Sequence, residues 1–321
     1  MLTVQKFGGS SLASAERIRR AAGIIASARA SGADVVAVLS ARGGTTDELM
    51  ADALELSPAP DTRELDVLLS TGELCSVALM AMTLKRLGCD CISLSGRQAG
   101  ILTDTQHGSA HIKAVHTQRI LRELEHGKAV IVAGFQGIDE NDDITTLGRG
   151  GSDTTAVALA AALHADRCEI YSDVDGIYTA DPRLVTGAKK LDVIDSYDML
   201  KLARGGSQVL HSRSVEAAIR YDIPVYLLSS FRSVPGTLMT HISDKSPLPS
   251  VTGITRDESK NRISIVGHGA DGELSERLRS VLRDKGISVL SSGIGDGIIT
   301  FDTPENELLP ALELIHRECY E

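Results

Sequence analysis

Short apolar runs alternate with helix-like stretches along most of this chain of 321 residues. Six runs are almost continuously hydrophobic, as in strands that a sheet buries on both faces: Val4–Phe7, Val35–Ser40, Cys91–Leu94, Val130–Ala133, Cys168–Tyr171 and Val225–Leu228. Helical patterns lie between them, over Ala15–Ser31, Leu74–Leu87, His111–Glu125, Thr154–Ala165 and Ser196–Arg220. This order predicts an α/β fold in which helices cover both faces of a mainly parallel sheet.

The composition changes over Phe231–Pro249, where proline, serine and threonine accumulate, as in a turn followed by a linker. We therefore expect one domain over residues 1–240, a linker over 241–249 and a second domain over 250–321. In the second domain the order strand, helix, strand, strand, helix predicts a small ferredoxin-like α/β fold. Its expected elements are strands at Arg262–Gly267, Ile287–Ser291 and Gly297–Phe301, and helices at Glu273–Lys285 and Pro304–Cys319.

Composition and charge exclude several classes of function. Aromatic residues make up 3% of the chain, there is no Trp, and the net charge is -10, so we expect no nucleic-acid partner. We see no apolar run of about 20 residues and no signal-peptide pattern, so we expect no membrane partner. Five cysteines without a CxxC pair indicate reduced thiols and a cytoplasmic protein.

The first candidate for chemistry is the segment Lys6–Ser11, in which a strand ends in two glycines and two serines. Glycines let backbone N–H groups approach an anion, and a helix that begins there adds a favourable dipole. Lys6 could neutralise a phosphate. Taken alone, the segment is an ordinary strand-to-helix turn, and no Walker A pattern occurs in the chain.

The second candidate is Thr145–Thr155, which places three glycines, Arg149, Ser152 and Asp153 before an alanine-rich helix. Arginine can hold a carboxylate with two parallel hydrogen bonds, and free N–H groups at a helix start can bind an anion. Asp153 could instead be a helix N-cap. The whole set exceeds what capping requires.

The third candidate is Ile170–Arg183, where a buried strand runs into a polar loop. Ligands of open α/β sheets bind at such carboxyl ends. The stretch Asp173–Gly176 is similar to the start of a calcium loop, but the terminal Glu is missing, so we do not expect calcium. His107, His111 and His116 have near-helical spacing, which we interpret as a solvated polar stretch rather than a metal site.

Together these segments resemble the aspartate kinases of the amino-acid kinase superfamily. The resemblance rests on five motifs in order: KFGGSS, SARGGTTDEL from Ser40, STGE from Ser70, GRGGSDTTA from Gly148 and YSDVDGIYTADPR from Tyr171. It extends from residue 1 to about 240, and the stretch after Val251 resembles the entry to the family's regulatory ACT domains. The resemblance implies a three-layer αβα sandwich of the amino-acid kinase fold plus a small ferredoxin-like, ACT-like α/β domain.

The resemblance also implies a reaction, the transfer of the γ-phosphoryl group of ATP to the side-chain carboxylate of L-aspartate, with Mg²⁺ accompanying the nucleotide. It implies catalytic roles for Lys6, Arg149 and Asp153. The residues implied for aspartate are Thr46, Glu73, Arg149, Gly150, Gly151 and Ser152. Those implied for ATP are Lys6, Gly8, Gly9, Ser40, Ser172, Asp173, Tyr178, Asp181 and Arg183. No residue is assigned directly to a metal.

Two departures from the family pattern affect these expectations. Gln208 stands where the family has a Lys that helps to stabilise the transition state, so we expect slower turnover or a substitute cation. The C-terminal region has room for one ACT module rather than two, and it lacks the usual effector pattern. We therefore expect weak or absent feedback inhibition by lysine or threonine. The resemblance also implies a homodimer formed through this domain.

Two other functions stay open. One is a kinase for another amino acid or small carboxylate, although the match at Thr46, Glu73 and Arg149 argues against it. The other is a non-catalytic amino-acid-sensing subunit. Gln208 and the altered C-terminal domain favour it, and the intact Lys6, Asp153 and Arg149 oppose it.

Overall fold

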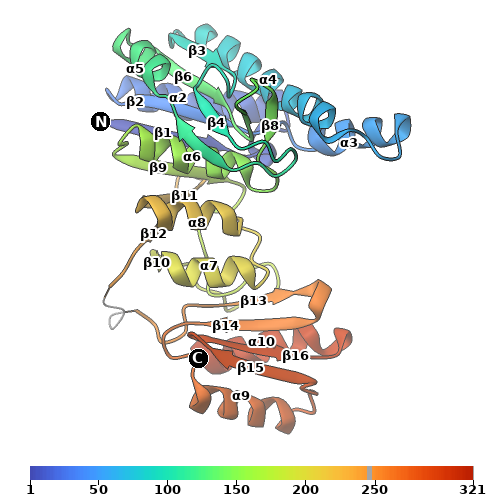
Figure 1. Ribbon diagram of the computed structural model, residues 1–321. Helices are drawn as coiled ribbons and strands as arrows, with labels where there is room; N and C mark the ends of the chain where they lie inside the picture. Colours follow the sequence, from blue (N-terminus) through green and yellow to red (C-terminus); the bar gives the residue numbers. More distant parts are fainter. Residues whose placement is uncertain (244–247, 321) are drawn as a thin grey trace. The chain divides into compact units, whose positions relative to one another are not determined.

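A computed structural model describes residues 1–243 and 248–320 (Figure 1). The chain divides into two compact units, one formed by Met1–Asp175 with Glu216–Gly236 and the other by Gly176–Val215 with Thr237–Glu321. The linker expected over 241–249 includes residues 244–247, which lie outside the described residues.

The first unit is built on a parallel sheet with the strand order β11-β9-β1-β2-β6-β3. The strands are β1 (Leu2–Phe7), β2 (Asp34–Leu39), β3 (Cys91–Leu94), β6 (Ala129–Ala133), β9 (Arg167–Ser172) and β11 (Val225–Ser229). Each of the six predicted strands is therefore confirmed, with small shifts at the ends.

Alternate residues of the strands face two helical layers. Val35, Ala37 and Leu39 of β2 pack with α2 (Ala15–Ala30) and α4 (Thr62–Arg86) in one apolar core. On the other side, α6 (Gly151–Ala162) contacts β1, β2 and β9, and α5 (Gln118–Glu125) contacts β6. Two further helices follow the first two strands, α1 (Gly9–Leu12) after β1 and α3 (Thr45–Leu56) after β2. The result is the predicted three-layer arrangement (Figure 1).

A second small sheet in this unit has the order β5-β4-β7-β8. Its strands are β4 (Ile101–Thr103), β5 (Ile112–Val115), β7 (Gln136–Ile138) and β8 (Ile144–Thr146). The prediction of one helix over His111–Glu125 was wrong, since β5 occupies its first turn and α5 begins only at Gln118. The β-branched Ile112 and Val115 pair with β4, which fixes the extended conformation.

The second unit contains an antiparallel sheet with the order β13-β14-β16-β15. Its elements are β13 (Gly253–Asp257), β14 (Arg262–Val266), α9 (Gly272–Asp284), β15 (Ser291–Gly295), β16 (Ile298–Asp302) and α10 (Leu308–Tyr320), with one-turn helices at Glu258–Lys260 and Glu305–Glu307. β10 (Val193–Asp195) and β12 (Thr237–Thr240) pair in parallel. The predicted order of elements holds, and β13 is an additional strand.

Two predictions for this part of the chain were wrong. The helix expected over Ser196–Arg220 is two helices, α7 (Ser196–Arg204) and α8 (Ser212–Tyr221). Gly206 has φ 113°, outside the helical range, and a Cβ there would lie 2.2 Å from the carbonyl oxygen of Arg256. The strand expected over Ile287–Ser291 begins only at Ser291.

Helix α4, with 25 residues, is long and apolar enough to cross a membrane by length and composition alone, contrary to our expectation. Half of its most apolar window is buried inside the protein. Val77, Met80 and Leu84 lie in the core beneath the sheet, and Asp66 and Glu73 are also buried. The burial of α4 in the core of the first unit therefore explains its apolar character.

Candidate active site

The carboxyl ends of four neighbouring strands lie in register in the first unit. Phe7 is paired with Leu39 on one side and with Tyr171 on the other, and Leu39 is paired with Ala133. Gly8 and Ser40, which follow β1 and β2, and Ser172, the last residue of β9, therefore lie at one edge of the sheet. In open α/β sheets this edge is where ligands bind.

Lys6 and Asp153 form an ion pair at this edge. Lys6 Nζ lies 2.6 Å from Asp153 Oδ1, and the two side chains are 10% and 14% exposed. Lys6 is held by β1 at the centre of the sheet, and Asp153 is in the first turn of α6. Asp153 is not the N-cap of α6, a position that Gly150 occupies. The carboxylate therefore has the role of fixing a cation rather than capping a helix.

The loops after β1 and β2 approach each other closely. The amide of Gly43 donates to the carbonyl oxygen of Gly9 at 3.0 Å. A Cβ on Gly9 would lie 3.0 Å from the carbonyl oxygen of Ala41, so the packing favours glycine there. A Cβ on Gly8 would lie 3.3 Å from Lys6 Nζ, so the Lys6 ammonium lies beside the glycine backbone. Backbone and lysine can thus contact one anion together.

Glu73 is buried beside the same loops, with 3% of its surface exposed. Its Oε1 accepts a hydrogen bond from the amide of Ala41 at 2.7 Å. Within residues 1–243 and 248–320, its Oε2 has no hydrogen-bond partner. Burial raises the pKa of Glu73 to about 7. A buried carboxylate oxygen without a partner costs free energy, which a cationic ligand group would recover.

The glycine-rich segment before α6 presents Arg149 to solvent. Arg149 is exposed, and no hydrogen bond or ion pair involves it in the described part of the chain. Ser152, in the first turn of α6, is buried against Gly134, the residue that follows β6. A Cβ on Gly134 would lie 2.8 Å from Ser152 Oγ. The segment thus combines a buried, packed helix start with one free guanidinium that can bind a carboxylate.

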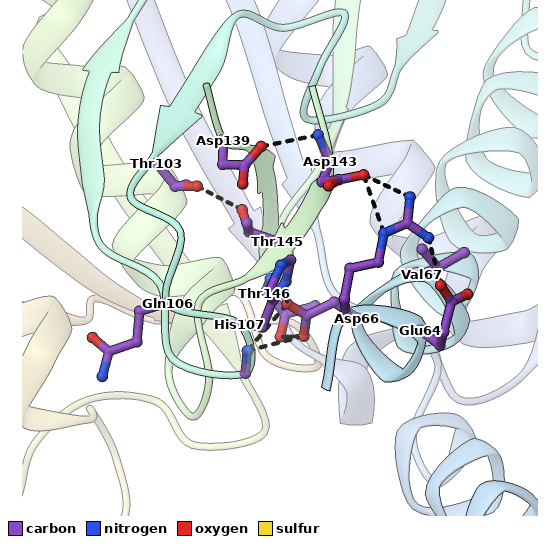
Figure 2. A network of polar contacts seen from close by, with 12 residues as sticks. Glu64, Asp66, Val67, Thr103, Gln106, His107, Asp139, Asp143, Thr145 and Thr146 are labelled. Carbon is purple, nitrogen blue, oxygen red and sulfur yellow. Dashed lines mark hydrogen bonds and ion pairs between the residues drawn. The ribbon is translucent and has the colours of Figure 1, made fainter. Parts of the chain in front are cut away.

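A buried carboxylate on α4 fixes the strand that leads into this segment (Figure 2). Asp66 is 1% exposed and accepts hydrogen bonds from the amide and the hydroxyl of Thr146, at 3.0 and 2.5 Å. It also contacts His107 Nδ1 at 2.9 Å and accepts from the amide of Gly108 at 3.1 Å. Since Thr146 precedes Arg149 by three residues, Asp66 anchors the base of the Arg149 loop.

Comparison with known proteins identifies the family. The profile of the amino acid kinase family matches residues 1–229. The aspartokinase of Corynebacterium glutamicum is 46% identical over 98% of this chain and 77% of the relative. The chain belongs to the amino acid kinase family, among the aspartokinases. The aspartokinase of Mycobacterium tuberculosis is 51% identical over 83% of this chain, which spans 64% of that relative's length.

Solved structures of aspartokinases have the same fold. The aspartate kinase from Synechocystis aligns with a TM-score of 0.69 and 38% identity, over 98% of this chain and 54% of that one. Aspartokinase III of E. coli in complex with aspartate and ADP aligns with a TM-score of 0.72 and 27% identity, over 98% of this chain and 84% of that one. The predicted fold class and family resemblance are thereby confirmed.

The structure brings together most of the first-unit residues that the aspartokinase motifs pointed to. Ser40 directly follows β2, and its amide donates to the carbonyl oxygen of Phe7 at 3.1 Å. Thr46 is the second residue of α3, which packs along α4. Lys6, Gly8, Gly9, Glu73, Asp153 and the segment Gly150–Ser152 lie at the sheet edge described above. Asp173 is exposed just beyond β9.

Three predicted nucleotide residues, Tyr178, Asp181 and Arg183, belong to the second compact unit. Arg183 pairs with Asp181, with Nη2 2.7 Å from Oδ2. Tyr178 forms a β-bridge with Lys190. Gln208 is exposed between α7 and α8, and its Nε2 donates to the carbonyl oxygen of Gly206 at 3.2 Å.

The sequence analysis missed the Asp66 cluster. His107 and His111 were interpreted as a solvated polar stretch, yet each contacts a carboxylate, Asp66 for His107 and Asp104 for His111. The helix expected over Leu74–Leu87 starts at Thr62 in the structure, and this places Asp66 and Glu73, seven residues apart, on the same side of α4. A charged residue at such a position indicates a buried partner.

Proposed function

We propose that this chain transfers the γ-phosphoryl group of ATP to the β-carboxylate of L-aspartate, giving 4-phospho-L-aspartate. The observation that carries the proposal is the buried Glu73, whose Oε2 has no partner in the described residues and which lies beside the loops that follow β1 and β2. An amino-acid ammonium group is a ligand that would satisfy such an oxygen. The E. coli relative, solved in complex with aspartate and ADP, supports this choice of substrates.

In this proposal, recognition and chemistry use different side chains. Glu73 pairs with the substrate ammonium and the exposed Arg149 with a substrate carboxylate, with Thr46, Gly150, Gly151 and Ser152 alongside. Lys6, oriented by Asp153, neutralises the charge that spreads over the transferring phosphoryl group. Gly8, Gly9 and Ser40 contact the phosphates, and the rest of the nucleotide is bound by Ser172, Asp173, Tyr178, Asp181 and Arg183.

No strong general base is required, because the β-carboxylate of aspartate is already ionised at neutral pH. The difficulty is to bring two anions together. Among residues 1–243 and 248–320, no group of three or more His, Cys, Asp and Glu side chains could hold a metal ion. Mg²⁺ would instead be held mainly by the nucleotide phosphates, and Asp153 is a carboxylate of this site that could contact it. Bound there, Mg²⁺ would supply charge neutralisation.

Three further features belong to the proposal. Feedback inhibition by lysine or threonine is weak or absent. The chain forms a homodimer through the C-terminal domain, which is supported by β15, a fully exposed strand at a sheet edge. The protein is cytoplasmic, which the five free cysteines support. Inhibition assays with lysine and threonine, singly and together, test the first feature, and light scattering of wild type and of an Ile294→Lys variant tests the second.

Hydroxylamine trapping of the acyl phosphate tests the reaction. Product with L-aspartate and ATP, but not with other amino acids, is the expected outcome. Product with another acid would support a different substrate, and no product with any acid would support a sensing subunit. Glu73→Ala should lose product with aspartate while nucleotide binding, measured by calorimetry with MgATP, is kept.

A further inference from the structure

Thr179 lies within the proposed nucleotide segment, one residue after Tyr178 and two before Asp181. It is 2% exposed, and every polar atom of the residue is hydrogen-bonded. Its amide donates to the carbonyl oxygen of Lys189 at 2.9 Å, and its Oγ1 accepts from the amide of Lys189 at 2.9 Å. These two bonds close the segment into a loop.

The two remaining partners of Thr179 come from the C-terminal region of the same unit. The amide of Ile254, in β13, donates to the carbonyl oxygen of Thr179 at 2.8 Å. His316, in α10, places Nε2 2.9 Å from Thr179 Oγ1. His316 is 2% exposed, and its ring packs on Tyr320 with 4.6 Å between centroids. A buried histidine thus joins α10 to the proposed nucleotide segment.

Apolar contacts reinforce this connection. Ala180 and Val185, from the nucleotide segment, are buried in the same apolar cluster as Ile254, Phe301 and Ile315. Because interiors are closely packed, a shift of α10 relative to the sheet has to move these side chains or open a void. The position of the segment is therefore set by the C-terminal region and not only by its own turns.

We propose that His316 is a positioning residue for ATP, acting through Thr179 on the flanking Tyr178 and Asp181. This inference rests on the proposed function, which assigns Tyr178 and Asp181 to the nucleotide. It predicts that disturbing α10 at this point weakens ATP binding and leaves the aspartate site, built on Glu73 and Arg149 in the other unit, unaffected.

The test is a comparison of KM values in the full chain. His316→Phe keeps a buried ring but removes the bond to Thr179, and it should raise KM for ATP roughly five- to tenfold, as expected for one buried hydrogen bond. KM for aspartate should stay within about twofold on the same reasoning. His316→Gln offers an amide near the position of Nε2 and should restore most of the ATP affinity.

Tyr320→Phe is the matched control. It removes a half-buried bond of the same helix, from Tyr320 Oη to the carbonyl oxygen of Val251, without touching Thr179. Its KM for ATP should equal that of the wild type. If His316→Phe does not fold, Thr179→Val replaces it, with Thr179→Ser as the conservative variant that keeps the hydroxyl.

The inference would be overturned by an unchanged KM for ATP in His316→Phe, or by equal rises in KM for ATP and for aspartate. Calorimetry with MgATP distinguishes a wrong role for His316 from a wrong proposed function. Wild type that makes acyl phosphate while His316→Phe binds MgATP normally contradicts only the role of His316. Wild type that neither binds MgATP nor makes acyl phosphate contradicts the proposed function.

Discussion

Glu73 accepts a hydrogen bond from the amide of Ala41 at 2.7 Å through Oε1, while its Oε2 has no partner among the residues that the structure describes. Burial raises the pKa of this carboxyl group to about 7. Since only the ionised form pairs with an ammonium group, we expect KM for aspartate to rise toward tenfold per pH unit below pH 7. Measurement of kcat/KM between about pH 5.5 and 8.5 checks this. Glu73→Gln should lack this pH dependence of kcat/KM. A wild-type profile that is flat across pH 7 would exclude ionised Glu73 as the partner of the substrate ammonium group.

The same carboxyl group affects stability with a definite sign. Its pKa is raised from 4.5 to about 7, so between these values the folded state keeps a proton that the unfolded state releases. The free energy of unfolding therefore falls as pH rises through this window, by about 3 kcal/mol in total. Chemical denaturation at several pH values should show this loss in the wild type and a smaller one in Glu73→Gln. Equal losses in both proteins would contradict the assignment.

The pair of Lys6 and Asp153 should act as a unit in catalysis. Lys6→Met removes the cation next to the proposed phosphate site, and we expect kcat to fall about 10²- to 10³-fold. Asp153→Asn should lower kcat as well, and the double variant should lose much less than the product of both effects. Lys128→Met is the control. Lys128 also forms an ion pair, with its Nζ 2.8 Å from Glu123 Oε2, but this pair does not lie at the sheet edge that carries the site. Additive losses would mean that the two residues act separately.

Asp66 is expected to matter for both stability and aspartate binding. The carboxylate of Asp66 contacts four groups, which come from His107, Gly108 and Thr146. Asp66→Asn replaces this carboxylate with an amide and should lower the free energy of unfolding by about 2–4 kcal/mol. In the folded fraction, KM for aspartate should rise more than KM for ATP, because the Arg149 loop loses its anchor. Asp104→Asn is the control, since the partner of Asp104, His111, is largely exposed. Equal effects of both variants on KM would oppose an anchoring role.

Gln208 is the position at which a gain of activity is expected. Restoring the family residue with Gln208→Lys should raise kcat by up to about 100-fold if a cation there stabilises the transition state. Steady-state assays with saturating ATP and aspartate measure this directly. An unchanged kcat would show that another cation fills the role or that none is needed.

Much of the fold could be predicted because burial on both faces leaves a clear sequence pattern. β6, for example, is buried at all five positions and is continuously apolar. The predictions failed where tertiary contacts override local pattern. Ile112–Val115 looked like the start of an amphipathic helix, but its pairing with β4 makes it a strand. Gly206 ended a helix through a close contact with Arg256, a residue distant in sequence.

The candidate site was predicted as separate motifs, and the structure supplied their connections. The proximity of Lys6 and Asp153 could not be derived from a separation of 147 positions, whereas the pairing of β1 and β9 and the start of α6 explain it. Asp66 was missed because its partners, His107 between β4 and β5 and Thr146 in β8, come from two separate hairpins that no local pattern relates to α4.

The course of the chain between the units has a consequence for making shorter proteins. The chain leaves the first unit after Asp175, returns at Glu216 and leaves again after Gly236, so no single cut separates the two. A fragment that stops at residue 240 would keep Ala180 and Val185 but lose the apolar partners that bury them. We expect such a fragment to be a poorly folded remnant with exposed apolar surface rather than an unregulated kinase.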